Sequence, residues 1–181
     1  MKRIAVSIVA VLSLAFGVGS ALADDDHDGL GKPTVETGPV PAWVLASRDA
    51  GGSCSKLPAN TTITMQTGTF TSKTWSKKDR HGVTTFSNET HSEGTATDLT
   101  GHVYDWEYDN EFTINDRGNP DVFSGPMDDS FELDGHGPAH LRNGFKAVFT
   151  TDFLSFASFR PIRSFGDPIS FPDGAAHCDP L

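Results

Sequence analysis

Hydrophobic and polar residues alternate through the segment HVYDWEYDNEFTI, residues 102–114. Successive side chains of an extended strand point to opposite faces, so this alternation predicts a strand with one apolar face and one acidic face. The apolar face is formed by Tyr104, Trp106, Tyr108, Phe112 and Ile114, and the acidic face by Asp105, Glu107, Asp109 and Glu111.

The next two apolar segments continue the pattern. In residues 121–134 the apolar positions are Phe123, Met127, Phe131 and Leu133, and the polar ones are Asp128, Ser130, Glu132 and Asp134. The apolar side continues with Leu141, Phe145, Ala147, Phe149 and Phe153. At least three neighbouring strands are therefore expected to share one aromatic-rich face.

Turn sequences divide this region into six expected strands. The strands are predicted at residues 61–75, 83–97, 102–115, 121–134, 141–153 and 156–164, with the links KKDRHG, DLTG, DRGNP and DGHGPA. No long segment shows the 3.6-residue period of an amphipathic helix. Because short links join antiparallel neighbours, the pattern predicts an all-β antiparallel meander.

A sheet with one large apolar face must bury that face. The expected strands are long for a sandwich, and Gly94 and Gly125-Pro126 are typical of bends at the corners of a barrel. We therefore predict a single-domain meander closed or nearly closed into a β-barrel, with a two-sheet β-sandwich as the alternative.

The amino-terminal residues have the form of a bacterial-type signal peptide. Lys2 and Arg3 precede an apolar run that ends in Ala21-Leu22-Ala23, which predicts cleavage before Asp24 and a secreted or periplasmic protein; an uncleaved membrane anchor is the alternative. The expected organisation is a signal peptide at 1–23, an acidic and Gly/Pro-rich arm at 24–58, and an antiparallel β domain with a carboxy-terminal tail at 59–181.

The net charge of the mature chain limits the classes of partner that it is expected to bind. Without Lys2 and Arg3, 24 acidic and 12 basic residues remain, a formal charge of −12. Nucleic acids and anionic membranes repel such a chain, so neither is expected as a partner after cleavage. The sequence makes no prediction of oligomeric state.

The two cysteines, Cys54 and Cys178, predict one disulfide in an exported protein. This bond would tie the Gly- and Pro-rich tail to the segment that precedes the first long strand. The alternative is that Cys178, beside His177, is a nucleophile or a metal ligand.

Two short motifs resemble metal sites without completing one. Asp24, Asp26 and Asp28 have the spacing of a calcium loop, but the twelfth position is Val35 rather than an acid. His136 and His140 have a zinc-like spacing, which brings two imidazoles together on a helix, whereas Gly137 and Pro138 favour a turn. We therefore expect no metal and no cofactor, and these five residues are the alternatives.

The acidic face contains the candidates for acid–base chemistry. If Leu99–Gly101 form a three-residue loop with Gly101 left-handed, then Glu93 lies opposite Glu107 and His91 opposite Asp109. Facing like charges are destabilising, so the glutamates need a cation, a raised pKa, or a neighbouring Lys or Arg. The candidates His91, Glu93, Glu107 and Asp109 could also belong to an ordinary solvated face.

Three functions remain open. The first is a secreted or periplasmic binding module for a small apolar or aromatic molecule, and the second is an interaction or structural domain with no pocket. The third is an acid–base enzyme, which is least favoured because no catalytic motif is present. The binding module is favoured slightly, with candidate pocket residues Tyr104, Trp106, Phe123, Phe131 and Phe149. Ordinary core packing is the alternative role of these aromatic residues.

Overall fold

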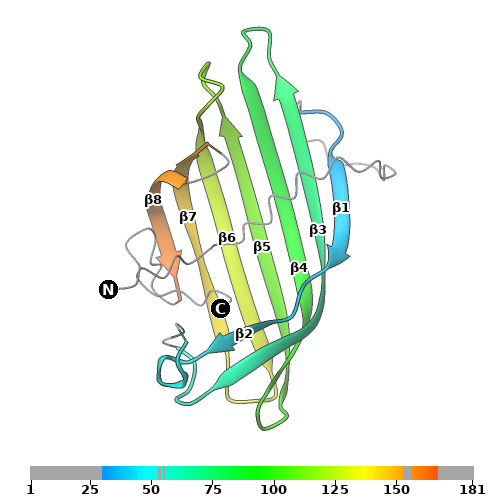
Figure 1. Cartoon of the computed structure of the whole chain (residues 1–181), viewed down its shortest axis with the longest axis vertical. Coiled ribbons are helices and arrows are strands. Elements are labelled where there is room, and N and C mark those ends of the chain that lie inside the picture. Colours follow the sequence, from blue (N-terminus) through cyan, green and yellow to red (C-terminus); the bar gives the residue numbers. More distant parts are fainter. Residues whose placement is uncertain (1–29, 53, 55, 153–155, 167–181) are drawn as a thin grey trace.

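The computed structural model describes residues 30–52, 54, 56–152 and 156–166, and these form eight strands and one turn of 3-10 helix (Figure 1). The elements are β1 (Thr34–Pro39), β2 (Trp43–Ala46), η1 (Arg48–Ala50), β3 (Thr62–Lys78), β4 (Thr84–Asp98), β5 (Val103–Asn115), β6 (Phe123–Gly135), β7 (Leu141–Thr151) and β8 (Phe156–Phe165). None of the described residues form a helix of the length and apolarity needed to span a membrane. The expected signal peptide at 1–23 lies outside the described residues.

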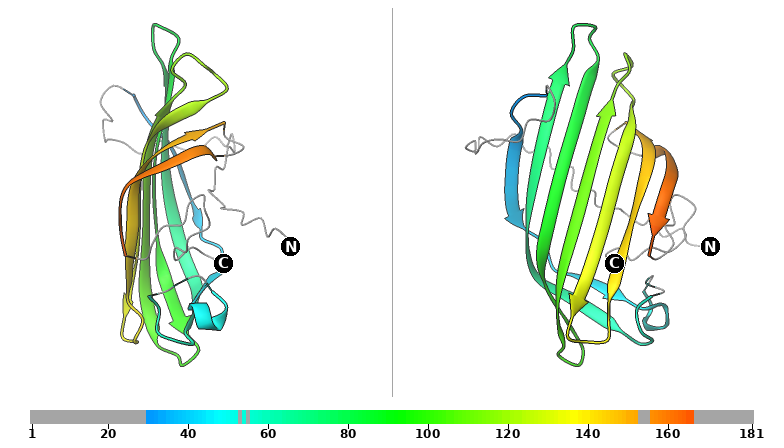
Figure 2. Two further views of the ribbon diagram at one scale, coloured as in Figure 1. Left: turned by 90° about the vertical axis from the view of Figure 1, so that its left-hand side faces the viewer. Right: turned by 180° about the vertical axis from the view of Figure 1, so that it is seen from behind.

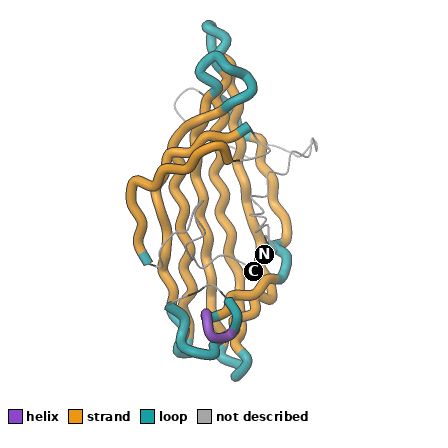
Figure 3. Tube along the Cα trace, turned by 60° about the vertical axis from the view of Figure 1, so that its left-hand side comes forward, coloured by secondary structure: helices purple, strands orange, loops and turns teal. Residues whose placement is uncertain are grey.

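All eight strands belong to one antiparallel sheet. Its order is β1-β3-β4-β5-β6-β7-β8, and β2 also pairs with β3. The predicted all-β fold and the predicted meander from β3 to β8 are confirmed. In the tube of Figure 3 the strands run almost the whole length of the molecule, and most loops lie at its two ends.

The predicted closure into a barrel is not confirmed. Strands β1 and β8 form the two edges of the sheet, and they do not pair with each other in the described part of the chain. The sheet curves, but its edges stay apart (Figure 2). A second sheet, as in the alternative sandwich, is not formed by the described residues either. Instead, β2 crosses one end of the apolar face and covers it, so that end is buried without closure.

The bend of β3 explains how the amino-terminal arm supplies two strands. Strand β1 pairs with residues 69–74 of β3, and β2 pairs with residues 62–65 of the same strand. A register shift between Met65 and Thr67 separates the two regions. The β4–β5 ladder runs through Gly94 without a shift, so this predicted bend is replaced by one in β3.

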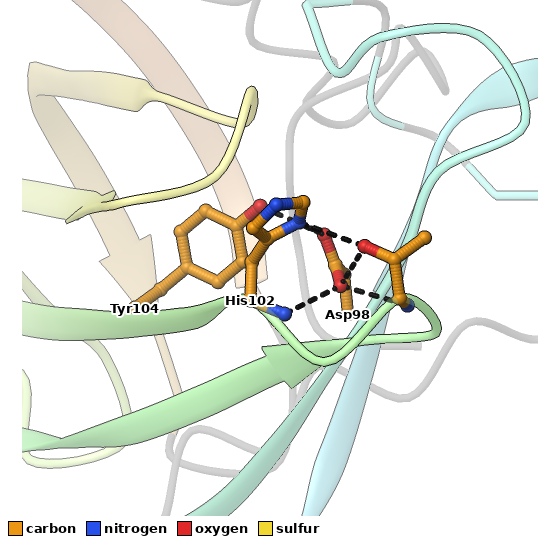
Figure 4. Close-up of polar contacts among 4 residues, drawn as sticks. Asp98, His102 and Tyr104 are labelled. Carbon is orange, nitrogen blue, oxygen red and sulfur yellow. Dashed lines mark hydrogen bonds and ion pairs between the residues drawn. The ribbon is translucent and has the colours of Figure 1, made fainter.

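The hairpin between β4 and β5 has the predicted geometry. Gly101 has a φ of 89°, and Asp98 donates its backbone N–H to the carbonyl of His102 at 3.1 Å. The Asp98 carboxylate accepts hydrogen bonds from the backbone N–H of Thr100 (2.9 Å) and of His102 (3.0 Å), and from the Tyr104 hydroxyl (3.0 Å) (Figure 4). The Thr100 hydroxyl (2.7 Å) and the His102 imidazole (2.8 Å) also contact this carboxylate. Partial burial opposes ionisation of Asp98, but the side-chain bonds from Thr100 and His102, with those from the His102 backbone and Tyr104, hold its pKa well below the usual range.

The inner face of the sheet buries two separate apolar clusters. One lies under β2, where the Trp43 ring packs 5.9 Å from Trp106 and 5.8 Å from Phe131. The other lies towards the opposite ends of the strands and is built around Ile114, Phe123 and Phe149.

A row of polar side chains crosses the same inner face between these clusters. Ser72 pairs with Thr90, Thr90 with Asn110, and Asn110 with Asp129, so one polar residue comes from each strand from β3 to β6. Thr90 donates a hydrogen bond to Ser72 at 3.0 Å, and Asn110 donates one to Asp129 at 3.1 Å. The inner face is therefore not one continuous aromatic surface.

Candidate functional site

Four predicted acid–base residues come together on the outer, acidic face of the sheet. His91 Nδ1 lies 2.8 Å from Asp109 Oδ1 and 3.8 Å from Glu107 Oε1, and its Nε2 lies 3.8 Å from Glu93 Oε2. We call His91, Glu93, Glu107 and Asp109 the His91 cluster.

The register of one hairpin brings the His91 cluster together. His91 is paired with Asp109, and Glu93 with Glu107, on the adjacent strands β4 and β5. Residues two apart on a strand share a face, so all four side chains project to the same side. The cluster is thus a direct consequence of the three-residue loop Leu99–Gly101, because a slip of one residue would change every facing pair.

When it is protonated, the His91 imidazole supplies the positive charge that the facing glutamates require. His91 lies within 3.8 Å of both Glu93 and Glu107, which otherwise place like charges opposite each other. The hydrogen bond to Asp109 raises the pKa of His91 despite partial burial, and the charges of Glu107 and Glu93 add to this effect. Among the described residues, none of the four forms an ion pair with Lys or Arg.

Two other carboxylates on the outer face have basic partners of their own. Asp128 pairs with Lys146, and Glu132 lies 3.6 Å from the Nε of Arg142. Within the His91 cluster, by contrast, the protonated form of His91 is the group that can balance the carboxylate charges.

An open depression of about 340 Å³ adjoins the cluster across β3 to β6. Its lining residues are Thr71, Lys73, Glu89, Thr90, His91, Asp109, Asn110, Glu111, Asp128, Asp129 and Ser130. Most of them belong to the outer face by strand alternation. Carboxylates outnumber the single lysine, so the depression suits a positively charged group rather than an anion.

Three members of the cluster also have the geometry of a metal site. One ligand atom from each of His91, Glu107 and Asp109 lies within 4.8 Å of the other two. In the part of the chain that the structure describes, this is the one group of three or more such residues. The sequence predicted acid–base chemistry for these residues and did not point to a metal there.

The metal alternatives from the sequence do not form such a group. Asp24, Asp26 and Asp28 lie outside the described residues. His136 and His140 are exposed, and His140 Nδ1 instead lies 2.6 Å from Asp134 Oδ1. This contact lowers the pKa of Asp134.

The five predicted pocket residues are buried but do not come together. Tyr104, Trp106 and Phe131 belong to the cluster under β2, whereas Phe123 and Phe149 belong to the other. None of the five lines the depression on the outer face or the second hollow, which is bordered by His140 and Arg142.

The predicted disulfide can be located at one end only. Cys54 is fully buried in the cluster under β2. Cys178 lies outside the described residues, so the bond between them stays a prediction.

The polar row of the inner face was not predicted from the sequence. The available signal was that Asn110 and Asp129 each interrupt an apolar alternation, between Tyr108 and Phe112 and between Met127 and Phe131. In the sheet these two interruptions face each other, and Tyr108 donates a hydrogen bond to Asp129 at 2.6 Å.

No protein-family model, curated protein or solved structure shows a significant match to this chain.

Proposed function

We propose that this protein is an exported binding module that holds a small positively charged ligand on the outer face of its sheet. The observation that carries the proposal is the convergence of three carboxylates on one imidazole, beside a depression whose lining includes four further carboxylates and one lysine. Such a surface attracts cations and repels anions.

The proposal places the ligand away from the aromatic face. The aromatic candidates pack in two clusters separated by the polar row, which supports a role in the core. The outer-face residues, in contrast, remain accessible: the side chains of His91, Glu107 and Asp109 are 46%, 59% and 52% exposed.

The export part of the proposal rests on the signal-peptide sequence and on the cysteine pair. Intact-mass measurement of protein secreted by its own host should give a chain that begins at Asp24 and is 2 Da lighter before reduction than after it. A mass that retains residues 1–23 would contradict cleavage, and an unchanged mass on reduction would contradict the disulfide.

An NMR titration tests the ligand class. Amide and side-chain signals of the mature protein are followed while Mg²⁺, Ca²⁺, Zn²⁺, putrescine or sulfate is added. We expect at least one cation to shift signals of β4 and β5 around the His91 cluster, and sulfate to leave them unchanged.

Asp105→Asn is a matched control for Asp109→Asn in this titration. Asp105 is exposed on the same face of the same strand but lies outside the cluster. Equal loss of cation binding in the two variants would mean a diffuse charge effect rather than a site. The absence of any cation-dependent shift would refute the proposal.

An acid–base enzyme is the second candidate, and the 2.8 Å contact between His91 and Asp109 favours it. This arrangement can orient an imidazole as a general base. A hydrolase screen of the mature protein should then show an activity that is lost in His91→Gln and retained in Asp105→Asn.

A further inference from the structure

We propose that the ligand of the His91 cluster is a divalent transition-metal ion of the zinc type, held by His91, Glu107 and Asp109. The inference rests on the proposed function, because it names the cation for the same outer-face site. It goes further by assigning the ligands and their separate roles.

The distances around one ring nitrogen suit insertion of a metal. In a tetrahedral zinc site with bonds of about 2.1 Å, two ligand atoms are about 3.4 Å apart. His91 Nδ1 lies 2.8 Å from the Asp109 oxygen and 3.8 Å from the Glu107 oxygen, so the two observed distances fall on either side of this value. Movements of about half an ångström in exposed side chains would make both contacts compatible with one ion.

The two nitrogens of the imidazole face different groups. Nδ1 faces the two proposed carboxylate ligands, whereas Nε2 faces Glu93 at 3.8 Å. A metal-bound histidine commonly donates its other N–H to a carboxylate, which orients the ring and strengthens its basicity. The 3.8 Å separation is longer than a hydrogen bond, so the proposal requires Glu93 to move closer to Nε2 when the metal binds. Glu93 is assigned as a positioning residue, and it need not bind the metal itself.

The donor set selects among cations. One imidazole with two carboxylates suits Zn²⁺ and related transition metals, whereas Ca²⁺ requires six to eight oxygen ligands and Mg²⁺ prefers oxygen ligands and water. The ion would also balance the facing charges of Glu93 and Glu107 and take the place of the proton on His91.

The site would keep an open position. The cluster supplies three ligands from an exposed sheet face, and a three-ligand zinc site leaves room for water or for a further ligand from solution. The adjoining depression lies on the same face as this position.

Calorimetry and cobalt absorption spectroscopy on the untagged mature protein test the assignment. Zn²⁺ is titrated into the protein, and Co²⁺ is used as a spectroscopic substitute. We expect one equivalent of zinc to bind, with affinity reduced at least about 100-fold in His91→Gln, which removes a ligand. Glu93→Gln should reduce affinity about 10-fold, because loss of a group that orients a metal-bound histidine typically weakens binding by about 10- to 100-fold.

His140→Gln and Asp105→Asn are the matched controls, because each removes an exposed side chain of the same type outside the cluster. Both variants should bind zinc as the wild type does, and far-UV circular dichroism should show that every variant is folded. Zinc binding that is equally strong in His91→Gln and wild type would overturn the metal assignment.

The outcomes separate the metal assignment from the proposed function. If Ca²⁺, Mg²⁺ or putrescine perturbs the cluster while Zn²⁺ and Co²⁺ do not, the transition-metal assignment fails and the cation-binding module stands. If no cation perturbs the cluster, both fail. The pH dependence gives a second readout, since zinc affinity should fall as His91 becomes protonated.

Discussion

Replacement of Trp106 by alanine tests whether β2 truly seals one end of the open sheet. Trp106 is 3% exposed, and its ring lies under Trp43 of β2 in an edge-to-face contact at 5.9 Å. Two glycines make room for it: Gly94 faces Trp106 across the ladder, and a Cβ on Gly68 would lie only 2.5 Å from its ring. Removal of the ring therefore leaves a space that small neighbours cannot fill.

The expected loss of stability is large. Replacement of a buried tryptophan or phenylalanine by alanine typically costs about 3–5 kcal/mol, because apolar burial is lost and a cavity remains. We expect about 4 kcal/mol here, a large part of the roughly 5–15 kcal/mol that stabilises an ordinary domain. The aromatic contact itself should appear as a coupling of about 1 kcal/mol between Trp106→Ala and Trp43→Ala.

Equilibrium urea unfolding of the mature protein, followed by far-UV circular dichroism, measures both quantities. Val103→Ala is the control, because Val103 belongs to the same strand but is 51% exposed, and it should cost less than about 0.5 kcal/mol. A cost below about 1 kcal/mol for Trp106→Ala, or no coupling with Trp43→Ala, would refute the inference that β2 covers a packed core at this end.

Three further predictions concern ionisation and the cysteines. The pKa of Asp98 is depressed in the folded state. The carboxylate therefore stabilises the fold above its unfolded pKa of 3.8, and this stability is lost as the pH falls through the folded pKa. In thermal unfolding between pH 2 and 6, the melting temperature of Asp98→Asn should depend less on pH than that of the wild type. The pKa of His91 is raised in the folded state. Its contribution to folding stability is therefore fully present below pH 6.5 and is lost as the pH rises through the folded pKa. An NMR titration of His91 should give a midpoint above 6.5 in the wild type and a lower one in Asp109→Asn, and equal midpoints would contradict Asp109 as the main cause of the shift. If Cys54 is bonded to Cys178, closing a loop of about 125 residues contributes up to about 5 kcal/mol, so Cys54→Ser should lower the urea midpoint, and reduction should destabilise only the wild type.

The strands from β3 to β8 could be predicted because their signals are local. The alternation in residues 102–114 fixes which side chains share a face, and the turn DLTG fixes the pairing of Glu93 with Glu107. These two features place His91 beside Asp109. The residues of the candidate site could therefore be predicted from the sequence, whereas the distances between their side chains could not.

The cover over the apolar face could not be predicted in the same way. The segment Trp43–Ala46 is apolar but only four residues long, and its place depends on where β3 bends away from β1. The bend coincides with the register shift between Met65 and Thr67, whereas the sequence pointed to the glycines of other strands. Bends of this kind depend on the packing of neighbouring strands as well as on the local residues.

The amino-acid sequence by itself determined the long antiparallel strands, their two chemically distinct faces and the register of the central hairpin, because side-chain alternation and turn geometry act over a few residues. Only the tertiary structure decided that the sheet stays open and that the aromatic residues divide into two clusters around a polar row. It also set the separations within the His91 cluster, which are 2.8 Å from His91 to Asp109 and 3.8 Å to Glu93 and to Glu107. These outcomes depend on the curvature of the whole sheet and on contacts between side chains from different strands, which no single segment specifies.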